Sequence, residues 1–294
     1  MDPGKFLLFA VAGLSEAAFL FIVAAGLSLV FGALRVINMA HGSLYMVAAF
    51  VTAYVAAQAG FIGGFWTGLL AAVIVTGLVG IVIEVVVLRR VYQSEHLYQL
   101  LGTYALTLII AGAVRILFGA SFRTISPPDF LNGSVTMIGG SYSTYDFFMI
   151  GAALAIGVGL WLMLYRTPLG RNIRAAVSDP VLLNATGVNV SRLYTIVFMI
   201  GAILAGLGGV LVAPSQVVSL DMDNNVLVLA FAISVIGGLG SIVGSLVGAL
   251  VVGMIESFGV SNRYTAHLSI AFIFIVMVVV LTIRPSGLFG RPEQ

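Results

Sequence analysis

The residues that could carry out chemistry are few in this chain of 294 residues. A phosphate-binding P-loop ends in Gly-Lys-Ser or Gly-Lys-Thr, but the single lysine, Lys5, is followed by phenylalanine. The three histidines, His41, His96 and His267, lie more than fifty positions apart, which excludes the zinc motif H-E-x-x-H. No cysteine is present to act as a nucleophile or a metal ligand. The sequence therefore predicts no enzymatic centre, no ATP site and no metal site in this chain.

Side chains suited to binding a small polar molecule occur in two places. Asn38 and Tyr45 belong to one short polar segment, and Thr103 and Thr107 belong to another stretch of the chain. The two threonines are four residues apart, so they share one face of a helix. Amide and hydroxyl groups can exchange hydrogen bonds with a polar ligand, and these four residues are candidates to line a path for one. A threonine hydroxyl can instead bond back to a carbonyl of its own helix, and this alternative stays open.

These side chains must be positioned by a very apolar chain. Apolar residues make up 61% and charged residues 8%, and the mean hydropathy is +1.16. A soluble domain carries roughly 25% charged residues, so a soluble globule is excluded. The net charge of +2 has no basic run behind it, so nucleic-acid binding is not expected. The composition indicates an all-α polytopic protein embedded in a lipid bilayer, because the apolar runs are continuous and do not alternate as in a membrane β-barrel.

The lengths of the apolar runs predict eight or nine membrane spans, since one spanning helix needs about 20 largely apolar residues. The expected spans are residues 13–33, 42–59, 64–88, 97–118, 147–165, 193–212 and 266–283, with a longer apolar stretch at 226–257. Residues 6–12 are expected to form a short interfacial lead-in. The long stretch is either one tilted helix or two short helices broken near 237–240, where the sequence is Gly-Gly-Leu-Gly.

The arginines predict which ends of the spans face the cytoplasm. Arg89 and Arg90 follow the third span, four arginines lie between 166 and 192, and Arg284 and Arg291 lie in the tail. These three segments are expected to share the cytoplasmic side, and the loop 119–146 and the loop near Asp221 and Asp223 the opposite side. This arrangement favours nine crossings or a re-entrant pair within 226–257. Glu84 and Arg115, near the ends of their spans, are expected to reach the membrane interfaces.

Two connections between spans are unusual. The first, residues 35–45, is half apolar and contains Arg35, Asn38, His41, Gly42 and Tyr45. A connection of this kind should dip into the membrane or pack within protein, and a tight hydrogen-bonded helix hairpin is the plainer interpretation. The second connection, residues 166–192, should form two short helices. Within it Ser178 or Asp179 is a good N-cap, Pro180 suits a first turn, and Gly187 is a helix stop.

Small residues predict close helix packing in the last third of the chain. Gly240, Gly244 and Gly248 are spaced four residues apart, which lets another backbone approach one helix face. Two interpretations stand for this series. It could provide packing within one subunit, or it could form an interface between subunits.

Several of these segments together resemble one known family. Gly26-Leu-Ser-Leu-Val-Phe-Gly-Ala-Leu-Arg-Val-Ile-Asn-Met-Ala-His-Gly42 is similar to the signature of the branched-chain amino acid permeases of ATP-binding-cassette (ABC) transporters, LivH type. Thr167-Pro-Leu-Gly-Arg171, the loop from Asp179 to Val188 and Gly237-Gly-Leu-Gly-Ser241 also resemble that family. The similarity extends from about Gly13 to the Arg-Pro-Ser-Gly-Leu-Phe-Gly sequence at 284–290.

The resemblance implies a multi-pass permease subunit of a bacterial inner-membrane importer for branched-chain amino acids, with residues 1–294 as one transmembrane domain. Its implied partners are a second, related permease, a periplasmic substrate-binding protein and two cytoplasmic ATPase subunits, which would hold the ATP and Mg that this chain does not bind. Residues 179–188 would be the coupling helix that docks on an ATPase. The implied coupling residues are Arg174, Asp179, Pro180, Asn184, Gly187 and Val188, and the signature hairpin would include Arg35, His41 and Gly42.

Other functions stay open at this point. Relatives that import urea or short amides share much of the pattern. A gradient-driven secondary transporter should show paired inverted repeats with interrupted helices, and the sequence contains no convincing repeat. A channel or a purely structural membrane subunit would need no capped cytoplasmic helix.

Overall fold

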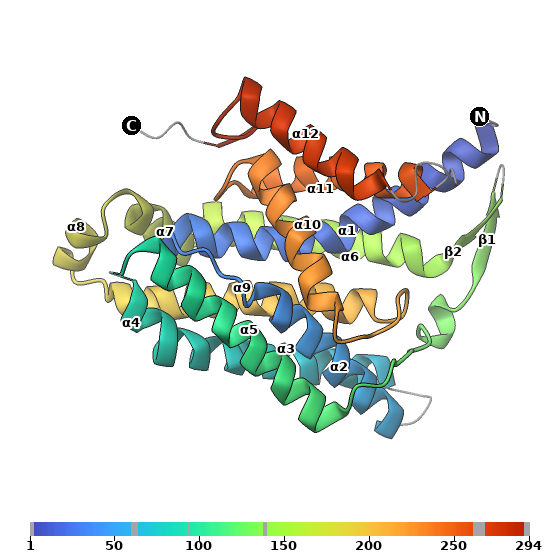
Figure 1. Cartoon of the computed structure of the whole chain (residues 1–294), viewed down its shortest axis with the longest axis horizontal. Coiled ribbons are helices and arrows are strands. Elements are labelled where there is room, and N and C mark those ends of the chain that lie inside the picture. Colours follow the sequence, from blue (N-terminus) through green and yellow to red (C-terminus); the bar gives the residue numbers. More distant parts are fainter. Residues whose placement is uncertain (1–2, 60–63, 93, 138–139, 261–267, 291–294) are drawn as a thin grey trace.

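A computed structural model describes residues 3–59, 64–92, 94–137, 140–260 and 268–290 of the chain. It is a bundle of helices built around one long central helix, α1 (Pro3–Leu34). This helix is apolar around its whole circumference and is buried over most of its length by α6, α9, α10 and α11 (Figure 1). The other helices in chain order are α2 (His41–Ala59), α3 (Gly64–Ile83), a π-helical turn (Glu84–Leu88), α4 (Arg89–Val91), α5 (His96–Phe118), α6 (Thr144–Arg166), α7 (Pro168–Ser178), α8 (Pro180–Ala185), α9 (Val190–Val212), α10 (Met222–Gly237), α11 (Ile242–Val260) and α12 (Ser269–Ile283).

The expected polytopic architecture is confirmed. Among the described residues, six helices are long and apolar enough to cross a membrane: α1, α3 with its continuation to Val91, α5, α6, α9 and α11. The apolar helices α10 and α12 are shorter. Residues 6–12, expected as an interfacial lead-in, belong to the same continuous helix as the first span, because α1 is already helical from Pro3. The predicted start of the last span at residue 266 lies outside the described residues, as do His267 and Arg291.

The basic segments lie at one end of the bundle. Figure 1 shows α4, α8 and the C-terminal end of α12 toward the left, whereas α1 begins on the right. The described parts of the three arginine-rich segments therefore lie toward one end of the bundle, and the start of α1 lies at the opposite end. Exposed apolar stripes run between the two ends, for example Leu70, Ile74 and Leu78 on α3, which are 58–62% exposed. Such stripes are typical of helix faces that contact lipid.

The long apolar stretch is broken into two helices, as one of the two alternatives predicted. Gly238 and Gly240 adopt the left-handed region at φ +100° and +84°, which ends α10 and turns the chain into α11. The tail holds this turn in place, because Leu288 N donates to the Ile236 carbonyl and Phe289 N donates to the Gly237 carbonyl, both at 2.9 Å. Figure 1 shows α10 crossing α1 at a steep angle.

The glycine series packs inside the subunit and is not one helix face. Gly240 lies in the turn before α11, where a Cβ would come within 3.0 Å of the Cα atom of Gly32 on α1. Gly244 lies directly against the backbone of Gly237, and Gly248 lies against the Ile233 carbonyl. The interpretation as packing within one subunit is therefore supported, since each glycine of the series meets a neighbouring segment of its own chain.

The loop before α6 contains a β-hairpin that the sequence did not predict. Strands β1 (Ser134–Met137) and β2 (Gly140–Ser143) pair antiparallel, with Val135 opposite Tyr142. The hairpin lies at the right-hand end of the bundle, opposite α8 (Figure 1). Earlier in the same loop, the backbones of Arg123 and Val218 form an isolated antiparallel bridge, which ties this loop to the connection between α9 and α10.

Candidate functional site

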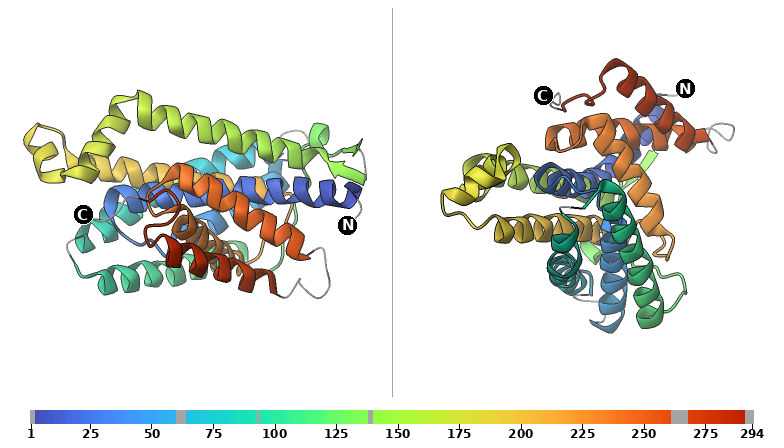
Figure 2. Two further views of the ribbon diagram at one scale, coloured as in Figure 1. Left: turned by 90° about the horizontal axis from the view of Figure 1, so that it is seen from above. Right: turned by 60° about the vertical axis from the view of Figure 1, so that its left-hand side comes forward.

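The loop from 166 to 192 forms two capped helices, as predicted. The Thr167 hydroxyl accepts a hydrogen bond from Gly170 N at 3.2 Å and caps α7. The Asp179 carboxylate accepts from the backbone N–H groups of Val181 and Leu182, both at 2.9 Å, and caps α8. Gly187 follows α8 with φ +89°, a conformation that side-chain-bearing residues rarely adopt. Figure 2 shows this pair of helices projecting beyond the rest of the bundle.

Helix α7 is fixed to the bundle, whereas α8 is exposed. Ile173 and Ala176 bury one face of α7. The Arg174 guanidinium lies 5.3 Å from the centre of the Tyr165 ring and donates to the Leu164 carbonyl at the end of α6. Arg174 therefore holds α7 on α6. Its role as a coupling residue stays a prediction, because the side chain is also exposed on the surface of α7.

The exposed surface of α8 combines apolar and polar groups. Val181 is 78% exposed and Leu182 is 64% exposed, because α8 lies beyond the end of the bundle. Asp179, Pro180, Asn184 and Gly187 are also exposed, and Val188 is half-buried. Large apolar side chains at such a tip mark a surface suited to a groove on another protein.

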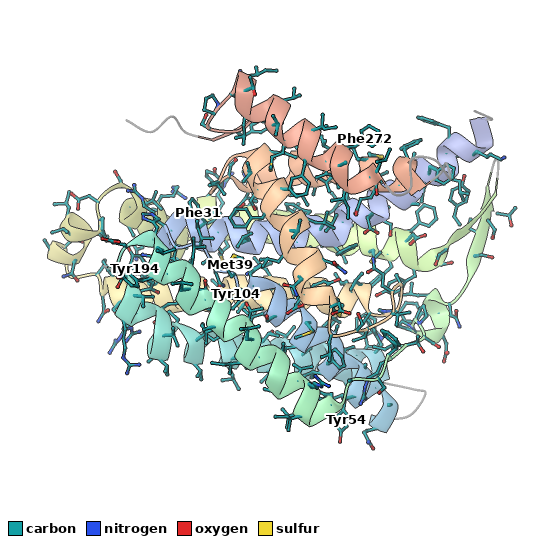
Figure 3. The ribbon with its side chains drawn as sticks, viewed as in Figure 1. Phe31, Met39, Tyr54, Tyr104, Tyr194 and Phe272 are labelled. Atoms are coloured by element: carbon teal, nitrogen blue, oxygen red, sulfur yellow. The ribbon has the colours of Figure 1, made fainter. Side chains whose placement is uncertain are left out.

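The connection between α1 and α2 packs within the protein, as predicted. Arg35 leaves α1 with φ +53°, and residues 36–41 are mostly buried. The Asn38 side-chain oxygen accepts from Ala40 N at 3.1 Å, and His41 Nε2 lies 2.9 Å from the Val23 carbonyl of α1. The hairpin also touches α5, where the Thr103 hydroxyl donates to the Ile37 carbonyl at 3.3 Å. Figure 3 shows Met39 and Tyr104 in this region.

The same hairpin links the loop from 166 to 192 to α10. Arg35 Nη2 donates to the Val177 carbonyl of α7 at 3.5 Å. At the other end of the hairpin, Gly42 lies directly against the Asp223 carbonyl, where a Cβ would overlap the oxygen. The Ser43 hydroxyl donates to the Asp223 carboxylate at 3.4 Å. These contacts form a continuous route from α7 to the first turn of α10.

The four predicted path residues do not act as one set. Thr103 and Thr107 bond back to helix carbonyls at 3.0 and 3.2 Å, which confirms the alternative stated for them. Asn38 and Thr103 are completely buried, so they do not line an open path in this chain. The Tyr45 ring instead packs against α1, where it stacks on Phe19 with the ring centroids 6.4 Å apart. Of the four residues, Thr107 borders a cavity.

Sequence reasoning missed a polar network at the end of α3. Glu84 was expected to reach the membrane interface, but its side chain is fully buried. The carboxylate lies 3.1 Å from Arg89 Nη2 and accepts hydrogen bonds from Thr195 at 2.7 Å and Tyr92 at 3.1 Å. Burial and the nearby carboxylate raise the pKa of Tyr92. The network joins α3 to α9 just after the loop from 166 to 192, at a π-helical turn that alters the direction of the side chains.

Replacing Glu84 with alanine is expected to lower the free energy of unfolding by about 2 kcal/mol. Stability is lost because the hydroxyl groups of Tyr92 and Thr195 would no longer have a carboxylate to accept their hydrogen bonds. Arg89 is 41% exposed and can be hydrated instead. Thermal unfolding of the purified protein in detergent measures the effect. Glu95→Ala, at an exposed residue that follows in the same connection, is the control and should change little. Equal stability of the two variants would contradict the role assigned to the network.

Comparisons with known proteins agree with this geometry. A family model described as "Branched-chain amino acid transport system / permease component" matches residues 9–281. The high-affinity branched-chain amino acid transport system permease protein BraD of Pseudomonas aeruginosa is 28% identical, over 96% of this chain and 95% of its own length. The corresponding LivH protein of Escherichia coli is 26% identical, over 92% of this chain and 91% of its own.

A solved structure shares the fold. PsaBC from Streptococcus pneumoniae, in complex with Fab, superimposes with a TM-score of 0.51 at 13% identity, covering 95% of this chain and 92% of that chain. Because the family model spans almost all of the bundle, the chain belongs to the family of permease components of branched-chain amino acid transport systems, and it is a multi-pass membrane transport subunit rather than an enzyme.

Proposed function

We propose that this chain is the permease subunit of an ABC importer for branched-chain amino acids in the bacterial inner membrane. The observation that carries the proposal is α8, a capped helix with exposed Val181 and Leu182 at the arginine-rich end of a membrane bundle. The printed names of BraD and LivH support the substrate class. The whole chain would act as one transmembrane domain.

The proposed assembly contains a second related permease, two cytoplasmic ATPases and a periplasmic substrate-binding protein. The ATPases would hold ATP and Mg, because this chain has no Gly-Lys-Ser/Thr loop. An ATPase groove would receive α8, with Asp179, Pro180, Asn184, Gly187 and Val188 at or beside the contact. Arg174 would keep α7 fixed to α6 during this docking.

The contacts within the chain suggest how movement at α8 would reach the membrane. ATP binding would close the ATPase pair and displace α8 together with α7. Arg35 contacts α7, and the hairpin that follows it packs against the first turn of α10 through Gly42 and Ser43. A displacement of α7 would therefore shift α10 relative to α5 and alternate the access of the pathway between the two sides.

Purification and transport test this proposal. After co-expression with its neighbouring transporter genes, the tagged chain is expected to co-purify with two nucleotide-binding subunits and a second permease. In proteoliposomes with the loaded binding protein, we expect ATP-driven uptake of labelled leucine and no uptake of urea. Uptake of urea without leucine would contradict the substrate class. Purification without ATPase subunits would contradict the transporter class.

A further inference from the structure

A cavity of about 280 Å³ lies between the outer half of α5 and the start of α10. This volume is close to the lower end of small-molecule pockets, roughly 300–1,000 Å³. On α5 its lining recurs every three or four residues from Tyr104 to Arg115, so it forms one face of that helix. The opposite wall is residues 220–224. Tyr104 marks one edge of the cavity and is 49% exposed (Figure 3).

Two opposite charges face this cavity without pairing. Arg115 and Asp221 both line it and both are exposed. Within the part of the chain that the structure describes, neither residue takes part in a salt bridge. Arg115 lies on a membrane-spanning helix, where a charge is costly unless it faces a partner or a water-filled path. The pair is therefore available to a ligand that carries both charges.

A third charged group lies behind the first two and is already engaged. Asp223 is 2% exposed. Its carboxylate accepts from Asn224 N at 2.7 Å and from the Ser43 hydroxyl at 3.4 Å. The hairpin thus fixes Asp223 in the wall and adds negative potential on the side of Asp221. Arg115 projects from the other wall, so the cavity has a positive side and a negative side.

The remaining wall is apolar and leaves space for a side chain. Leu108, Ala111 and Leu220 line it. Gly112 also lines it, and a Cβ at that position would meet no atom within 4 Å. A branched aliphatic side chain fits such a wall, because it removes apolar surface from water without needing a hydrogen-bond partner.

We propose that this cavity binds an α-amino acid during transport, with Arg115 on its carboxylate, Asp221 on its ammonium group and the Leu108–Leu220 wall on its aliphatic side chain. A guanidinium pairs with a carboxylate through two parallel hydrogen bonds, and a carboxylate accepts from an ammonium group. Urea carries neither charge. The inference rests on the proposed function and names the site at which the transporter discriminates amino acids from neutral amides.

The test uses the assembled transporter in phosphatidylglycerol liposomes with saturating leucine-loaded binding protein. Arg115→Gln and Asp221→Asn are each expected to lower the leucine uptake rate about tenfold or more. Arg115→Lys and Asp221→Glu, which keep the charges, should retain more of the rate than the charge-removing variants. Gly112→Leu should fill the cavity and block uptake. Gly151→Leu is its matched control on α6, on the opposite side of the bundle (Figure 2), where a Cβ also meets no atom within 4 Å.

The outcomes separate this site from the proposed function. If wild type does not transport leucine, the proposed function itself fails. If wild type transports leucine and both charge-removing variants do so at the wild-type rate, the cavity is not the site. Loss of the second permease from the purified variants would assign the two charges to subunit assembly and would also overturn the inference. If the variants lower leucine uptake only after phosphatidylethanolamine is added, the cavity would bind a lipid headgroup, and the inference would again be overturned.

Discussion

Val181→Asp is expected to reduce ATP-driven leucine uptake to background while the protein stays folded and inserted. The side chain is 78% exposed, so the change adds a charge without disturbing the core. In the proposed assembly this residue is buried in an ATPase groove, where an unpaired carboxylate is strongly unfavourable. The measurements are the amount of ATPase that co-purifies, the uptake rate and the unfolding temperature. We expect the first two to fall and the third to stay at the wild-type value.

The matched control is Val135→Asp, the same change at the opposite end of the molecule. Val135 is 43% exposed on β1. This variant should retain its ATPase subunits. Deletion of residues 179–188 and Gly187→Arg should reproduce the loss seen with Val181→Asp. At Gly187 a Cβ meets no atom within 4 Å, although the φ of +89° adds a backbone cost of about 1–2 kcal/mol. Wild-type uptake and ATPase binding by Val181→Asp would show that α8 does not couple the chain to an ATPase.

Gly42→Ala is expected to destabilise the protein by about 3–5 kcal/mol and to abolish uptake. The added Cβ would overlap the carbonyl oxygen of Asp223, and backbone atoms cannot move aside as a flexible side chain can. To relieve the overlap, α2 must separate from α10, which also breaks the contact between Ser43 and Asp223. Thermal unfolding in detergent and leucine uptake measure the two effects.

Gly159→Ala on α6 is the control for this prediction. A Cβ at Gly159 meets no atom within 4 Å. Since alanine is the better helix former by about 1 kcal/mol, this variant should be neutral or slightly more stable. The two glycine-to-alanine changes should therefore shift the free energy of unfolding in opposite directions. If Gly42→Ala unfolds at the wild-type temperature, the close approach of α2 and α10 is not required by the fold.

The spans and the two capped helices of the loop from 166 to 192 could be predicted because their signals are local. The run of apolar residues decides whether a segment is stable in a bilayer, whichever helices surround it. The caps at Thr167 and Asp179 act on backbone groups two or three residues away. The β-hairpin had no comparable signal, because SVTM and GSYS are short, polar-rich segments whose hydrogen bonds depend on pairing with each other.

The surroundings of individual polar residues could not be predicted in the same way. Glu84 is four residues from the end of its expected span, which suggests an interface, yet Thr195 on a distant segment brings a donor to it. Arg115 and residues 220–224 form one cavity although about a hundred residues separate them. The sequence pattern shows which face of a helix is apolar, but not which other helix it meets.

The amino-acid sequence alone determined that this chain is a polytopic membrane protein with three arginine-rich segments at one end and two capped helices at that end. These features follow from the cost of placing charge in hydrocarbon and from hydrogen bonds between near neighbours. Only the tertiary structure decided that Gly42 meets Asp223, that Glu84 is buried, and that Arg115 and Asp221 face one cavity. Those outcomes depend on packing between helices distant in the sequence, where several arrangements satisfy the same apolar pattern.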